Sequence, residues 1–140
     1  MIVLTKRDMQ LFVRARECSL KSQYKKGQRI GAIIVIGNKI ISMASNETKS
    51  HPVQFKLNPL RFEASKYDRC HNYIHAEMKC ILKCKDVDFK KAKIYVYRED
   101  LHGRLRMCRP CNACMAMIKE VGIRHVYYTS PDGFVHEVIA

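Results

Sequence analysis

The sequence contains no long hydrophobic run, and its first residues lack the pattern of an export signal. No stretch approaches the ~20 consecutive apolar residues that a membrane-spanning helix needs. The opening residues, MIVLTKRDMQ, hold only a short apolar patch before Lys6, Arg7 and Asp8, which is not the pattern of a secretory signal. Internal repeats and low-complexity segments are absent as well. We therefore expect a cytoplasmic protein with no membrane partner.

Acidic residues are scarce relative to basic ones. The chain has 13 Asp and Glu against 26 Lys and Arg, which gives a net charge of +13. An excess of this kind favours anionic partners, above all phosphates. A nucleotide or a single-stranded nucleic acid would supply that charge, and the alternative is a generally basic soluble protein with no nucleic-acid role.

Length and composition indicate one globular domain. A chain of 140 residues supports a single core, so we expect one domain over residues 1–140. Its apolar content of 47% is ordinary for a globular protein and argues against disorder. The composition is also compatible with a homo-oligomer.

Cysteine usage indicates metal binding rather than disulfides. There are seven cysteines, an odd number, and Cys108, Cys111 and Cys114 follow one another at the C-x-x-C spacing. Together with the missing signal, this favours a reducing compartment and metal ligation. Cys80 and Cys84 lie four residues apart on an expected helix, where we predict them to be buried as small hydrophobic side chains.

Two clusters contain residue types that bind metals and move protons. The first is His75-x-Glu77, and the second is Pro110-Cys111-x-x-Cys114. Zn²⁺ takes imidazole nitrogen and thiolate sulfur, and two cysteines separated by two residues can reach one tetrahedral ion. His75, Cys111 and Cys114 would leave a fourth position for water, which ionises near neutral pH on zinc. Glu77 is then the group expected to carry protons between that water and a ring nitrogen.

Other sets of ligands remain open. Cys108 lies three residues before Cys111 and could close a Cys₃His tetrahedron, which would make the zinc structural and the protein a nucleic-acid-binding module. A second metal site is conceivable from residues without tight spacing, namely Cys18, His51, Cys70 and His71.

Hydrophobic periodicity predicts an alternating order of helices and strands. The expected helices span about residues 5–22, with a capping box at Thr5 and Asp8, then 75–84, and a third from Pro110 at its first position to the stop at Gly122. The expected strands are 30–36, 39–44, 93–97, 123–129 and 134–139. Residues 45–71 and 98–109 are expected to be loops, the former with at most one helical turn. Both zinc clusters therefore lie at helix N-termini.

The two clusters and this order of elements resemble the cytidine/deoxycytidylate deaminase superfamily, from Thr5 to about Ile139. The combination H-x-E…P-C-x-x-C is the signature of zinc-dependent nucleobase deaminases. The resemblance implies an α/β fold, a three-layer α-β-α sandwich around a five-stranded mixed sheet. It implies His75, Cys111 and Cys114 as zinc ligands, Glu77 as the proton shuttle, and Asn46 as a contact to the substrate sugar.

The end of the chain narrows the resemblance to one branch. A parallel connection between the last two strands needs a dozen or more residues, but only those around Pro131-Asp132-Gly133 are available. We therefore predict a C-terminal antiparallel hairpin. That topology resembles the free-cytidine and the bacterial toxin-type deaminases. Because free-cytidine deaminases usually have cysteine at the position of His75, the combination of His75 with a terminal hairpin resembles the phage-type or bacterial toxin-like branch.

These observations predict hydrolytic deamination of cytosine to uracil in a phosphate-bearing substrate, with release of ammonia. The substrate is expected to be a nucleotide such as dCMP or CMP, or single-stranded DNA or RNA. Adenosine-to-inosine deamination on RNA is the rival activity. Besides Asn46, the expected substrate contacts are Arg104, Arg106 and Arg109, whose guanidinium groups match phosphate, and Tyr128, which could stack on a base.

Overall fold

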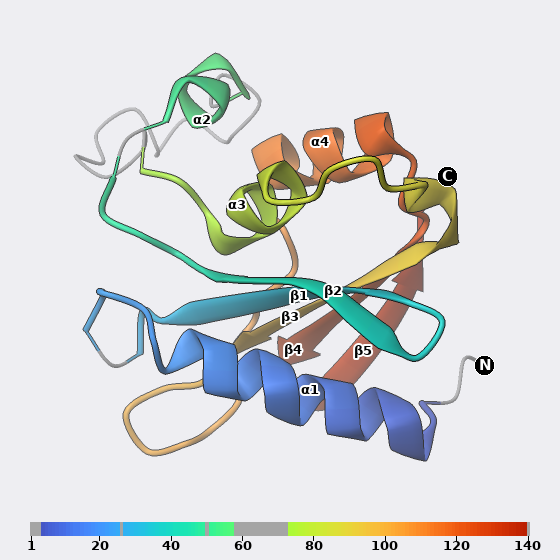
Figure 1. Cartoon of the computed structure of the whole chain (residues 1–140). Coiled ribbons are helices and arrows are strands. Elements are labelled where there is room, and N and C mark those ends of the chain that lie inside the picture. The colour runs from blue at the N-terminus through green and yellow to red at the C-terminus, as the bar shows by residue number, and fades with distance from the viewer. Residues whose placement is uncertain (1–3, 26, 50, 58–72, 140) are drawn as a thin grey trace.

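A computed structural model describes residues 4–25, 27–49, 51–57 and 73–139, and Figure 1 shows their arrangement. The helices are α1 (Lys6–Ser19), α2 (Pro52–Leu57), α3 (Ala76–Leu82), the 3₁₀ helix η3 (Phe89–Lys91) and α4 (Asn112–Val121). The strands are β1 (Ile30–Ile36), β2 (Lys39–Ser45), β3 (Ala92–Arg98), β4 (His125–Ser130) and β5 (Gly133–Val138). In this part of the chain, no helix is long and apolar enough to cross a bilayer.

The five strands form one mixed sheet in the order β2-β1-β3-β4-β5. β3 and β4 pair in parallel, and α4 lies between them in the sequence, as a parallel connection requires. All other neighbours are antiparallel, including the terminal hairpin, in which Ser130 pairs with Gly133. The predicted C-terminal antiparallel hairpin is therefore confirmed.

Helix α1 covers one face of the sheet (Figure 1). Its start is fixed by the predicted capping box: Asp8 N–H donates to Thr5 Oγ1 at 3.0 Å, and Thr5 N–H donates to Asp8 Oδ2 at 2.8 Å. Phe12 packs edge-on against Tyr95 with ring centroids 5.4 Å apart. The helix approaches β1 so closely that a Cβ at Gly31 would stand 2.2 Å from the backbone oxygen of Ala15. Only glycine permits this contact.

Helices α2, α3 and α4 lie on the opposite face, which makes the third layer (Figure 1). The core there includes the buried side chains Ile34, Met78, Ile94 and Ile118. Strands β1, β3 and β4 are mostly buried on both faces, and in β1 the sequence IGAIIVI is a nearly continuous apolar run. The predicted three-layer α/β sandwich is confirmed.

Several predicted boundaries were wrong, each for a local reason. Helix α4 begins at Asn112 rather than at Pro110, because Cys111 has extended backbone angles and is the N-cap. Helix α1 ends at Ser19, before Ser22, whose hydroxyl instead donates to the Asn46 side chain at 2.6 Å. The region predicted as loop with one helical turn contains the six-residue helix α2, which is somewhat longer than one turn.

Candidate active site

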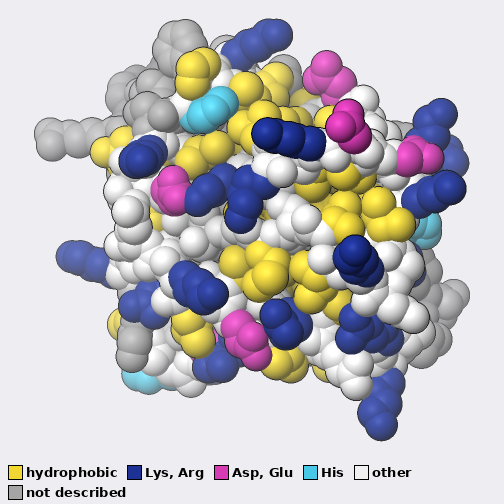
Figure 2. Space-filling model, in the orientation of Figure 1, with side chains coloured by type: hydrophobic (Ala, Val, Ile, Leu, Met, Phe, Trp, Pro, Cys, Tyr) yellow, Lys and Arg dark blue, Asp and Glu magenta, His cyan; other side chains and the backbone are white. Residues whose placement is uncertain are grey.

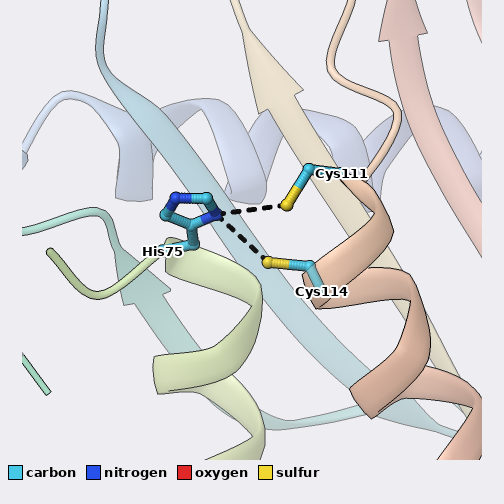
Figure 3. A group of neighbouring side chains, drawn as sticks. All are labelled: His75, Cys111 and Cys114. Carbon is cyan, nitrogen blue, oxygen red and sulfur yellow. Dashed lines mark hydrogen bonds between the residues drawn. The ribbon is translucent and has the colours of Figure 1, made fainter. Parts of the chain in front are cut away.

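Three metal-binding side chains converge where α3 and α4 begin. His75 is the N-cap of α3, Cys111 is the N-cap of α4, and Cys114 lies in the first turns of α4. His75 Nδ1 lies 3.2 Å from Cys114 Sγ and 3.6 Å from Cys111 Sγ, as Figure 3 shows. All three ligand atoms lie within 4.8 Å of one another. The fold therefore brings His75 close to Cys111, which lies 36 positions later in the sequence, as the sequence predicted.

The spacing of these atoms fits a tetrahedral zinc ion. With Zn–N near 2.05 Å and Zn–S near 2.3 Å, a tetrahedron separates nitrogen from sulfur by about 3.5 Å. The two observed nitrogen–sulfur distances bracket that value. Three protein ligands are the number found in catalytic zinc sites, which keep a fourth position for water or substrate.

The Cys111 thiol is held in an environment that favours the thiolate, whereas burial raises the pKa of Cys114. A hydrogen bond from the Cys114 thiol lowers the pKa of Cys111 to about 4, although burial acts in the opposite direction. The thiolate is the form of cysteine that binds zinc. The backbone N–H of His75 donates to Gln54 Oε1 at 3.0 Å, and Gln54 is fully buried. This contact from α2 fixes the start of α3 and could not be predicted from the sequence.

Glu77 lies in the first turn of α3 beside these ligands, with 4% of its surface exposed. Burial raises the pKa of Glu77, and this outweighs the opposing effect of His75. Its Oε1 is the one buried side-chain oxygen or nitrogen among the described residues that lacks a hydrogen-bond partner. A buried polar atom without a partner costs free energy, so it marks a place where a polar ligand would be bound favourably.

Cys108 does not join the ligand cluster. Its backbone N–H donates to Thr129 O at 2.9 Å, which keeps this segment beside β4, and its thiol is buried. Among the residues that the structure describes, the only group of metal-binding side chains is His75, Cys111 and Cys114. The closed Cys₃His site is therefore not formed. Of the second candidate set, Cys70 and His71 lie outside the described residues, and the His51 ring accepts a hydrogen bond from Val53 N–H at 3.1 Å.

A cavity of about 360 Å³ opens beside the cluster. Its walls come from the segment before β1, the end of β2, the starts of α3 and α4, and the end of β3. The lining residues are Tyr24, Gln28, Ile30, Asn46, His75, Glu77, Arg98, Met107, Cys108, Arg109 and Cys111. The cavity thus joins the ligand atoms and Glu77 to polar and cationic side chains.

Of the predicted substrate contacts, Asn46 and Arg109 line this cavity. Asn46 Oδ1 accepts from Ile30 N–H at 3.0 Å and from Ser22 Oγ at 2.6 Å, and its Nδ2 donates to Gln28 O at 2.9 Å. It therefore fastens the segment before β1 to the end of β2. One N–H of its amide is left over, and the contact to a sugar stays a prediction.

Arg104, Arg106 and Tyr128 are not part of the cavity wall. Arg104 is 74% exposed and pairs with Asp100 at 3.2 Å in a small hairpin that follows β3. Tyr128 is 7% exposed, and its hydroxyl donates to Glu137 at 3.0 Å, so its ring is not available for stacking on a base. The sequence prediction for Tyr128 failed because both faces of β4 are covered.

Arg98 also lines the cavity; it belongs to the arginine-rich segment 98–109, but the sequence did not single it out as a substrate contact. It is the last residue of β3, and its Nε donates to Gly27 O at 2.8 Å. Both of its terminal nitrogens remain without a carboxylate partner among the described residues. The signal in the sequence was its place at the end of a buried parallel strand, since ligands bind beyond the carboxyl ends of such strands.

Comparisons with known proteins agree with this geometry. Residues 5–130 match the cytidine and deoxycytidylate deaminase zinc-binding region. The chain is similar to the dCMP deaminase of cyanophage S-TIM5 in complex with dCMP and dUMP, with a TM-score of 0.58 and 16% identity over 91% of this chain and 83% of that one. The apo form of that enzyme gives a TM-score of 0.56 and 18% identity over 89% and 84%. No match was found among curated proteins.

At these identities the solved structures support the fold, whereas the family match covers most of the chain and includes both clusters. Its zinc-binding region and the His75, Cys111 and Cys114 cluster make Zn²⁺ the cofactor. The chain belongs to the cytidine and deoxycytidylate deaminase family and is a zinc-dependent deaminase of the cytosine type.

Proposed function

We propose that this protein hydrolyses the cytosine of a nucleoside monophosphate, such as dCMP or CMP, to uracil and ammonia. The observation that carries the proposal is Glu77: a buried carboxylate with one oxygen lacking a partner, beside three zinc-ligand atoms and on the wall of a cavity. A structural zinc site has no use for such a group, whereas a hydrolytic site requires one.

His75, Cys111 and Cys114 hold the zinc ion in this proposal. When bound, zinc supplies a water of lowered pKa, which is a nucleophile at neutral pH. Because the three ligands come from the starts of two helices, the N–H groups and dipoles there stabilise the thiolates. Gln54 keeps the His75 backbone in place from the side of α2.

Glu77 carries the protons. It accepts a proton from the water that attacks C4 of the ring and delivers a proton to N3. It then takes the remaining proton of the hydroxyl now on C4 and passes it to the amino nitrogen, so that the C4–N bond breaks, the C4 carbonyl of uracil forms and ammonia leaves. Cytosine and water are consumed, uracil and ammonia are formed, and Glu77 returns to its starting state.

Cationic groups at the cavity support a substrate that carries a phosphate. Arg98 and Arg109 both line it, and arginine donors match phosphate oxygens. The similar cyanophage enzyme was crystallised with dCMP and dUMP, which favours a mononucleotide here. On the face shown in Figure 2, Lys and Arg side chains are scattered rather than gathered into a stripe, so this face gives no support for a path along a polymer.

A product assay by mass spectrometry tests the proposal. Purified protein is offered dCMP, CMP, the nucleosides deoxycytidine and cytidine, single-stranded DNA and RNA, and the adenine equivalents. We expect the cytosine monophosphates to be converted to the corresponding uracil monophosphates, identified by their mass, with release of ammonia. Deamination of polymers alone, or of adenine alone, would contradict the proposal.

Replacement of the proton carrier provides the matching test of mechanism. Glu77→Gln keeps the shape of the side chain but cannot accept a proton, so we expect the rate to fall by ~10²- to 10⁴-fold. Zinc content should be unchanged, as measured by mass spectrometry of the metal. The control is Glu120→Gln, an exposed position on α4 away from the cavity lining, which should retain full activity.

A further inference from the structure

Arg109 lines the cavity and is hydrogen-bonded to Glu137 on the last strand of the sheet. Its Nε donates to Glu137 Oε1 at 2.9 Å, and its Nη2 donates to Glu137 Oε2 at 2.9 Å. The Tyr128 hydroxyl donates to the same Oε1 at 3.0 Å. Glu137 on β5 therefore receives three hydrogen bonds, two of them from a side chain that lines the cavity. A paired contact of this kind fixes both the position and the plane of a guanidinium group.

The paired hydrogen bonds to Glu137 use only one edge of the Arg109 guanidinium group. The Nε and Nη2 edge faces Glu137, so this pair leaves Nη1 and the second hydrogen of Nη2 unused. The side chains of Arg109 and Glu137 are 44% and 28% exposed, which places the pair at the rim rather than in the core. The free edge is the one that can donate two parallel hydrogen bonds to a phosphate.

We propose that Glu137 is a positioning residue for substrate recognition: it holds Arg109 so that the free guanidinium edge binds the phosphate of the nucleotide. This inference rests on the function proposed above. It assigns a role to a residue of the terminal hairpin that does not line the cavity and belongs to neither zinc cluster. Tyr128, predicted to stack on a base, instead supports Glu137 through its hydroxyl.

Positioning and plain electrostatics predict opposite effects for Glu137. As a negative charge near the cavity, Glu137 opposes the binding of a phosphate, so its neutralisation alone would tighten binding. As the group that orients Arg109, it strengthens binding, so its neutralisation would weaken it. The sign of the change therefore decides between the two roles.

The test compares KM for dCMP with KM for deoxycytidine, which has the same base and sugar but no phosphate. In Glu137→Gln we expect KM for dCMP to rise about tenfold, with kcat and the deoxycytidine KM changed less than about twofold, because only the phosphate contact is misaligned. Tyr128→Phe removes one hydrogen bond to Glu137, and we expect a smaller rise in the same direction. Glu120→Gln removes an equal charge from an exposed position that makes no contact with Arg109, and we expect no rise.

Several results would overturn the inference. A fall or no change in the KM for dCMP in Glu137→Gln would leave Glu137 as a charge only, and equal rises for both substrates would make it a general structural residue. Zinc content and thermal melting identify a variant that does not fold, in which case Tyr128→Phe decides. Wild-type protein that deaminates neither substrate would instead refute the proposed function. Equal KM values for the two substrates in the wild type would refute only the phosphate contact.

Discussion

At the scale of single residues, the cysteines near the site differ because their backbones are fixed differently. Cys111 has extended backbone angles and caps α4, which directs its sulfur towards His75 at 3.6 Å. Cys108, three positions earlier, is attached to β4 by the hydrogen bond from its N–H to Thr129 O. The same side-chain chemistry therefore lies inside the ligand cluster in one case and outside it in the other.

Replacing each cysteine by serine separates these roles. We expect Cys111→Ser and Cys114→Ser to lose zinc, because a neutral hydroxyl is a far poorer zinc ligand than a thiolate. They should also lose stability, since metal binding contributes to folding free energy. Cys108→Ser should retain one zinc per chain. The measurements are zinc per chain and thermal melting, and loss of zinc in Cys108→Ser would restore the closed structural site.

Two arginines make a matched pair for testing the cavity. Arg98 lines it, whereas Arg104 lies outside it, is 74% exposed and pairs with Asp100. We expect Arg98→Gln to raise the KM for dCMP about tenfold, the cost of one lost charged contact of ~1.4 kcal/mol. Arg104→Gln removes the same charge and should change the KM less than about twofold. Equal effects of the two variants would assign the contribution to overall charge.

At the scale of elements, the start of α1 depends on one carboxylate. Asp8 Oδ2 accepts from Thr5 N–H, and Asp8 Oδ1 accepts from the buried hydroxyl of Tyr95 at 2.6 Å. Burial acts to raise the pKa of Asp8, but the hydrogen bonds from Tyr95 and Thr5 lower it by more, so the pKa lies below its usual value. The ionised form therefore ties the helix to the sheet.

This depressed pKa predicts a dependence of stability on pH. The stabilisation by Asp8 is fully present above the unfolded-state pKa of ~3.9 and is lost as the pH falls through the lower folded-state pKa. We expect Asp8→Asn to lower the free energy of unfolding by ~1–2 kcal/mol at pH 7. The difference from the wild type should shrink below about pH 4, as measured by urea unfolding. The exposed Asp132→Asn is the control, and a difference that stays constant with pH would contradict this account.

At the scale of the whole molecule, the net charge is +13, but only a few of the cationic side chains, among them Arg98 and Arg109, line the cavity. Basic side chains are spread over the face shown in Figure 2. Charge distributed in this way raises the local concentration of any anion without selecting its length. Salt dependence of binding can therefore report how many phosphates the protein contacts.

A mononucleotide predicts a shallow response to salt. Between 50 and 200 mM salt we expect the KM for dCMP to rise less than about tenfold, whereas a polymer with 6–10 phosphate contacts would lose ~10³–10⁵ in affinity. Deoxycytidine, which has no phosphate, is the control and should show almost no change. A steep response measured with single-stranded DNA, together with its deamination, would identify a polymer substrate instead.

The sequence by itself determined the features that depend on neighbouring residues. The capping box at Thr5 and Asp8, the strand from Ile30 to Ile36 and the short terminal hairpin follow from local hydrogen bonds, a run of β-branched residues and a connection of few residues. The spacing in His75-x-Glu77 and in Cys111-x-x-Cys114 also predicted the ligand cluster. Such patterns can be read because each is encoded within one element.

Only the tertiary structure decided which side chains reach the cavity. Arg98 lies on its wall and Arg104 lies outside, although both belong to one basic segment. The contact between Arg109 and Glu137 joins residues 28 positions apart, and that between His75 and Gln54 joins residues 21 apart. These positions depend on strand order and on how helices pack against the sheet, which bring distant residues together without a local pattern in the sequence.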